Sequence, residues 1–146
     1  MRQIRAGNIV LASAAYALVG TATAALAGMA SSPAAVKGWR VAAWLLGLAV
    51  FGLHLTIERH RTAQRLSVAT HVALAVALGA FIVAALGPFR AHWGEPSRLK
   101  LALLSLLAWP VLTGAPAFVV ALIVGLLLDR VAGSPRASTT VSPNER

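Results

Sequence analysis

Long apolar stretches, separated by short polar segments, dominate the chain. They lie at about residues 9–29, 41–57, 66–87 and 99–128. Each is near or above the roughly 17 to 25 residues that cross a hydrocarbon core as an α-helix, and formal charge enters them only at Lys100, close to one end. The pattern predicts an all-α integral membrane protein, with a bundle of four transmembrane helices in residues 1–130.

The fourth stretch, residues 99–128, is too long for one straight span. As a continuous helix it would be about 45 Å long at ~1.5 Å per residue, against a core of ~30 Å. Pro110 and Pro116 each remove a backbone donor, and Gly114 lies between them. We therefore expect one span kinked at Pro110, Gly114 and Pro116. The kink either serves packing alone or exposes carbonyl groups that bind an ion or substrate.

Composition excludes a soluble domain. The chain is 58% hydrophobic and only 12% charged, too few polar residues to cover a globule of 146 residues. Its 13 Lys and Arg against 4 acidic residues lie mostly between the apolar stretches, so they point to lipid headgroups and away from nucleic acid. The absence of cysteine removes disulfides and thiolate metal sites.

The distribution of basic residues predicts an orientation. With the amino terminus inside, eight of the 13 Lys and Arg fall on the inner side, so both termini are expected in the cytoplasm of a bacterial type of inner membrane. Trp39, Trp44 and Trp93 then lie at the outer interface. The polar tail, residues 131–146, is expected to be disordered.

The first stretch allows two interpretations. A basic start, an apolar middle and small residues before a cut after Ala27 or Ala30 would suit a cleaved signal peptide. Its apolar part exceeds the usual ~7 to 15 residues, which favours an uncleaved span. Within it Gly20, Ala24 and Gly28 stand four apart, a helix-packing stripe that either joins neighbouring helices or forms a homodimer face.

Four ionisable residues form the candidate polar cluster. On the second predicted helix His54, Glu58 and Arg61 follow at i, i+4 and i+7 and share a face. An antiparallel hairpin brings His71 to a similar depth, roughly 5 to 10 Å below the inner interface at ~1.5 Å per residue. Such groups usually face the protein interior, because exposing them to lipid is costly.

The cluster leaves several functions open. It can be structural, with Glu58 paired to Arg59 or Arg61 and both histidines neutral. Alternatively, His54, Glu58 and His71 can relay protons or respond to pH. In a third interpretation, His54 and His71 hold a b-type heme. No spacing predicts a metal site, no residue is assigned to catalysis, and no cofactor other than heme is suggested.

We therefore expect a non-enzymatic accessory or interaction subunit of the membrane. Its partners would be the lipid bilayer and other membrane subunits or a second copy, with no nucleic acid. A small transporter or proton carrier is the alternative, and a heme protein comes third.

Overall fold

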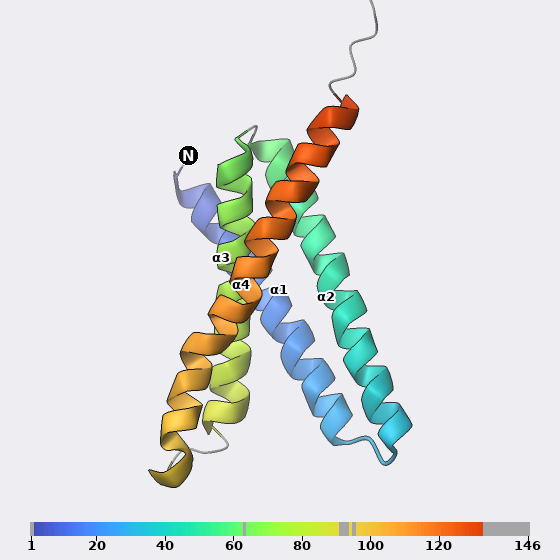
Figure 1. Cartoon of the computed structure of the whole chain (residues 1–146), viewed down its shortest axis with the longest axis vertical. Helices are drawn as coiled ribbons and strands as arrows, with labels where there is room; N and C mark the ends of the chain where they lie inside the picture. Colours follow the sequence, from blue (N-terminus) through green and yellow to red (C-terminus); the bar gives the residue numbers. More distant parts are fainter. Residues whose placement is uncertain (1, 63, 91–93, 95, 133–146) are drawn as a thin grey trace, which may run out of the picture.

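The computed structural model describes residues 2–62, 64–90, 94 and 96–132. Within these residues, all regular secondary structure is helical (Figure 1). Trp93 and residues 133–146 of the expected tail lie outside the described residues.

Four long helices and one π-helical turn make up the described chain. They are α1 (Arg2–Gly28), α2 (Pro33–Arg61), α3 (Arg65–Ala84), the π-turn η1 (Ala85–Phe89) and α4 (Pro96–Ala132). All four α-helices are long and apolar enough to cross a membrane, which confirms the all-α prediction with four candidate spans.

α2 is longer at both ends than the apolar pattern predicted. It begins at Pro33, where the Ser32 side chain accepts a hydrogen bond of 3.2 Å from the Ala35 amide and caps the helix. It continues through Glu58 to Arg61. The prediction of residues 41–57 stopped at charged positions, but a helix keeps its backbone bonds where its side chains reach the polar interface.

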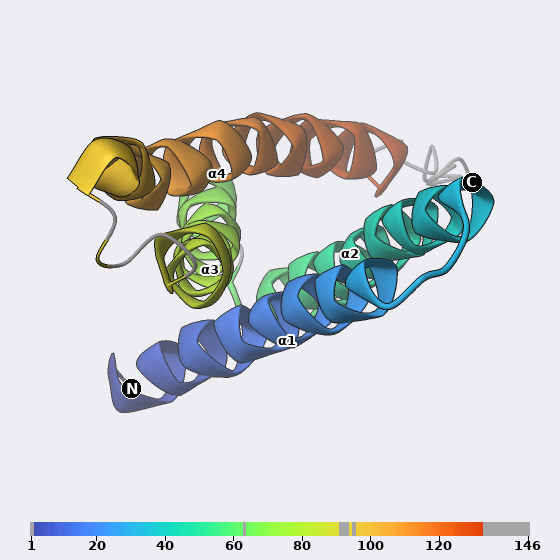
Figure 2. The same cartoon turned by 90° about the horizontal axis from the view of Figure 1, so that it is seen from below.

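α4 runs without interruption through both prolines, from Pro96 to Ala132. Figure 2 shows it as one continuous rod. The hydroxyl of Thr113 donates to the Trp109 carbonyl at 2.8 Å, between the prolines. The helix is therefore not broken at Pro110, Gly114 or Pro116, and a sharp kink there stays a prediction.

The irregular turn lies elsewhere, at the end of α3. η1 contains Pro88, which has no N–H to donate to the carbonyl one α-helical turn earlier. Loss of that bond accounts for local widening of the helix into a π-turn. An irregular turn at Pro88 was not predicted from the sequence.

α3 is the central helix of the fold. It packs against α1, α2 and α4, whereas α1 and α2 form one hairpin and α3 and α4 another (Figure 2). The hairpins converge where α2 joins α3 and diverge toward the α1–α2 turn (Figure 1). The core cluster, with Leu55, Val68, Val72 and Ala121, lies toward the converging end.

Glycines permit the closest helix contacts. A Cβ on Gly79 of α3 would lie 2.6 Å from Cβ of Tyr16, and one on Gly114 of α4 would lie 3.0 Å from Cβ of Ala77. Gly114, which the sequence suggested as part of a kink, is thus a contact between α4 and α3. Such approach is how helices gain packing energy in lipid.

The predicted stripe on α1 does not form one contact surface with the other described helices. A Cβ on Gly20 would lie 2.7 Å from Cγ2 of Val83 on α3, but Ala24 and Gly28 are exposed. The buried small residues of α1 are instead Ser13, Ala17 and Thr23. For Ala24 and Gly28 a homodimer face stays a prediction.

Leucine substitutions on α1 test this difference. Gly20→Leu should lower the free energy of unfolding by about 1 to 3 kcal/mol, because the side chain must displace Val83. Ala24→Leu is the matched control and should change stability little in the monomer. The measurement is unfolding by sodium dodecyl sulfate in mixed micelles. Equal losses for both variants would contradict the packing described for Gly20.

Candidate functional site

A buried carboxylate meets a histidine where α2 and α3 converge. His71 Nδ1 lies 3.0 Å from Glu58 Oε2, a distance at which the imidazole N–H donates to the carboxylate. Glu58 is only 3% exposed, whereas the His71 side chain is 17% exposed. Glu58 lies near the end of α2 and His71 near the start of α3, on either side of the short connection between Arg61 and Arg65. His71 is therefore the more exposed partner of this pair.

His54 and Tyr16 extend this polar group deeper between the helices. His54 precedes Glu58 by one turn of α2 and is 6% exposed. Its ring centroid lies 6.3 Å from that of Tyr16 on α1, with the planes tilted by 59°. Within the described residues, neither ring nitrogen of His54 nor the Tyr16 hydroxyl has a hydrogen-bond partner. We call Tyr16, His54, Glu58 and His71 the buried cluster.

Tyr16 was missed in the sequence analysis. It is the single tyrosine of the chain and lies in the middle of the first apolar stretch. Its phenol is the one weakly acidic group of that stretch, a signal that could have drawn attention to it. Its proximity to His54 depends on the packing of α1 against α2 and α3, which the sequence pattern does not specify.

The arginines do not join the buried cluster. Arg61 is exposed, and Arg59 pairs with Asp129 of α4, with its Nη2 2.7 Å from the carboxylate Oδ1. The contacts that Arg59 makes are with Asp129 and the Gly125 carbonyl of α4, and adjacent residues such as Glu58 and Arg59 point about 100° apart around a helix. The expected pairing of Glu58 with Arg59 or Arg61 is thus replaced by its contact with His71.

Asp129 is the second residue that the sequence analysis missed. Both of its carboxylate oxygens are engaged, one by Arg59 and the other by Nε of Arg65. Arg59 also donates to the Gly125 carbonyl at 3.1 Å. Its signal in the sequence was that it is the single aspartate of the chain and directly follows the fourth apolar stretch.

Ionisable residues are absent from the described helices between the buried cluster and the opposite end of the fold. Between His54 and Arg40 on α2, no residue is ionisable, and the same holds for α3 beyond His71. α4 likewise carries no ionisable residue from 101 to 128. The described helices therefore provide no route of ionisable groups from the buried cluster to the opposite end.

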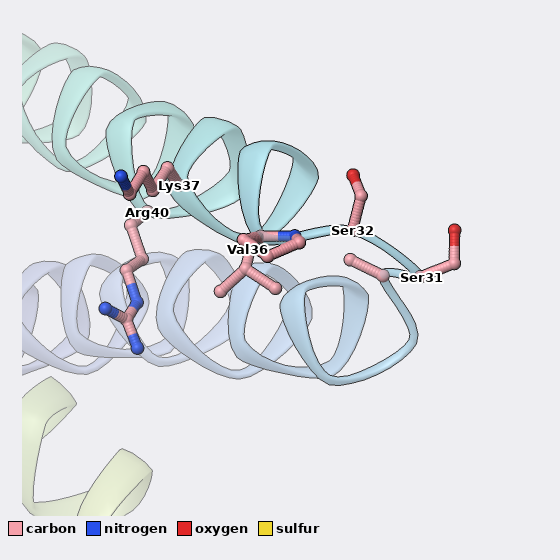
Figure 3. Close-up of a pocket in the computed structure, with 7 residues that line it drawn as sticks. Ser31, Ser32, Val36, Lys37 and Arg40 are labelled. Carbon is pink, nitrogen blue, oxygen red and sulfur yellow. The ribbon is translucent and has the colours of Figure 1, made fainter.

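A separate hollow lies at that opposite end, beside the α1–α2 turn (Figure 3). It encloses about 450 Å³ and is lined by Ser31, Val36, Lys37 and Arg40, among others. These residues are exposed or half-buried, and the hollow is open to its surroundings. It contains no buried polar group of the kind found in the buried cluster.

The chemistry available to the buried cluster is proton binding and release. Imidazole exchanges protons near neutral pH, and here one imidazole contacts a carboxylate while another lies one turn away. Among the described residues, no group of three or more His, Cys, Asp or Glu side chains is placed to hold a metal ion. A heme between His54 and His71 stays a prediction, with His71 Nδ1 engaged by Glu58. Comparison with protein-family models, curated proteins and solved structures finds no match to the chain.

Proposed function

We propose that the protein is a non-enzymatic accessory protein of the membrane whose helix packing responds to protons bound at the buried cluster. The observation that carries the proposal is His54, buried with both ring nitrogens unpartnered among the described residues, one turn from the Glu58–His71 contact. Buried polar groups without partners are rare in proteins, and each one calls for an explanation. The bacterial inner membrane and cytoplasmic termini are part of the proposal and rest on the distribution of basic residues.

Protonation would change the bonding of the buried cluster. A neutral imidazole offers one donor and one acceptor, whereas the charged form offers two donors and adds a positive charge. His54 lies on α2, near Tyr16 of α1 on one side and one turn before Glu58, the partner of His71, on the other. A change in its charge in such apolar surroundings is costly unless neighbouring helices adjust.

The geometry favours a response to protons over their transport. A carrier needs exchangeable groups, or an opening, on both sides of the membrane. Between Tyr16 and the basic residues at the opposite end, such as Arg40 and Lys100, the described helices place no ionisable side chain. The small-transporter alternative therefore has less support than a pH response.

A role as an interaction subunit is supported by the poor packing of α2. Its buried residues, His54, Leu55 and Glu58, all lie in its last two turns. Earlier in the helix Trp44 is 75% exposed, and Leu45, Leu46 and Leu48 are exposed as well. Lipid covers such a surface in a solitary protein, and a helix of another subunit or of a second copy covers it in a complex.

The absence of cysteine makes the proposal testable by distance measurement. Spin labels on Ser31→Cys and Lys100→Cys would report the separation of the two hairpins at their divergent ends. We expect this distance to differ between about pH 5 and pH 8, because imidazole charge changes over that range. His54→Leu should abolish the difference, and Arg61→Gln, on the same helix but exposed, should preserve it. An identical distance at both pH values in the unmodified cluster would contradict the proposal.

A further inference from the structure

A second polar site, independent of the buried cluster, joins the ends of three helices. Asp129 of α4 accepts from Arg59 of α2 and pairs with Arg65 at the start of α3. One carboxylate against two guanidinium groups leaves a local excess of one positive charge. Arg59 and Arg65 are partly exposed, with side-chain exposures of 27% and 50%.

A hollow of about 160 Å³ lies against these charges. Its lining includes the buried apolar side chains of Leu55, Val68 and Ala121 and, at its polar side, Thr62 and the Arg59–Asp129–Arg65 group. The volume exceeds the ~30 Å³ of one water molecule but is below the ~300 Å³ at which pockets for drug-sized ligands begin. It is suited to a small anionic group with an apolar attachment.

The guanidinium groups retain donors for such a group. Nη1 of Arg59 donates to the Gly125 carbonyl and Nη2 of Arg59 donates to Asp129. Nε of Arg65 pairs with the other carboxylate oxygen of Asp129. A guanidinium has five N–H donors, so further ones remain on both side chains. Paired arginine donors match phosphate oxygens in geometry as well as in charge.

We propose that this hollow binds the phosphate group of an anionic phospholipid. The site lies at the ends of candidate spans, where headgroups are found, and the exposed Arg61 and Arg130 add positive charge nearby. Basic pockets between transmembrane helices commonly bind anionic headgroups. The apolar lining favours a lipid over free phosphate, because only the lipid brings an apolar portion to cover it.

The test is binding of phosphatidylglycerol, with phosphatidylcholine and inorganic phosphate as comparison ligands, measured by native mass spectrometry of the full chain in detergent. We expect phosphatidylglycerol to bind more tightly than phosphatidylcholine. Arg65→Gln should weaken this binding about tenfold, through loss of charge-assisted hydrogen bonds. Arg61→Gln removes the same charge outside the hollow and should cost no more than about fivefold.

A second variant acts in the opposite direction. Asp129→Asn removes the carboxylate that competes with phosphate, so phosphatidylglycerol should bind more tightly. Equal losses for Arg65→Gln and Arg61→Gln would overturn the site, because binding would then follow net charge alone. Weaker binding by Asp129→Asn would also overturn it, and full competition by inorganic phosphate would overturn its assignment to a lipid. None of these outcomes depends on the pH response of the buried cluster.

Discussion

Replacing Gly79 with alanine is expected to lower the free energy of unfolding by about 1 to 3 kcal/mol, although alanine is the better helix former. The added Cβ would lie 2.6 Å from Cβ of Tyr16 and 3.1 Å from the backbone oxygen of Ser13. Neither atom is the end of a flexible side chain, so α1 must move away from α3. The measurement is unfolding by sodium dodecyl sulfate in mixed micelles.

Gly52→Ala on α2 is the matched control. A Cβ at Gly52 meets nothing within 4 Å, so this substitution should be neutral or raise stability by up to about 1 kcal/mol. A stable Gly79→Ala variant would show that α1 and α3 do not approach as closely as described. Because Gly79 contacts Tyr16, its substitution should also alter the separation of Tyr16 and His54.

Replacing His71 with alanine is expected to cost about 1 to 3 kcal/mol, because Glu58 is then left buried without its partner. Glu58→Gln should cost less, since an amide oxygen can still accept a hydrogen bond from His71. The double variant should be less destabilised than the sum of the two single variants, because both remove the same contact.

His60 provides the control for this series. It is exposed near the end of α2, so its replacement by alanine should change the free energy of unfolding little. The same unfolding assay measures all variants. Additive effects of the substitutions at Glu58 and His71 would contradict a direct bond between them.

Much of the fold could be predicted because a bilayer constrains a sequence strongly. An apolar stretch of sufficient length has few options other than a helix, since lipid offers no partner for backbone N–H and C=O groups. The four candidate spans follow from this. The helix ends were less predictable, as at Pro33, because caps and interfacial charges extend a helix beyond its apolar part.

Helix packing was the least predictable feature. The spacing of Gly20, Ala24 and Gly28 suggested one face, yet only Gly20 of these three is closely packed against another helix. Sequence periodicity places residues on a common face, but the crossing angle decides how far along that face contact continues. Gly114 suggested a kink in the sequence, and the structure places it in close contact with α3.

The candidate site was predictable where it depends on the hairpin alone. Glu58 and His71 belong to adjacent helices joined by a short turn, so the sequence placed both at one end of the hairpin. Counting residues from the turn set His71 level with His54, whereas its Nδ1 lies 3.0 Å from Glu58, one helical turn closer to the connection. Tyr16 and Asp129 reach the two polar sites from α1 and α4, the helices outside that hairpin. Their places depend on tertiary packing, which neither hydropathy nor spacing specifies.

The most direct test of proton binding at the buried cluster is nitrogen NMR of ¹⁵N-labelled imidazoles in the full chain. We expect acidification to change the imidazole signals of His54 and His71 together, because His71 contacts Glu58 and His54 lies one helical turn from it. Glu58→Gln should alter this change, whereas the signals of the exposed His60 should not depend on that substitution. If the signals of His54 and His71 stay the same at every pH at which the chain remains folded, or change alike with and without Glu58, the account of a proton-responsive cluster is contradicted.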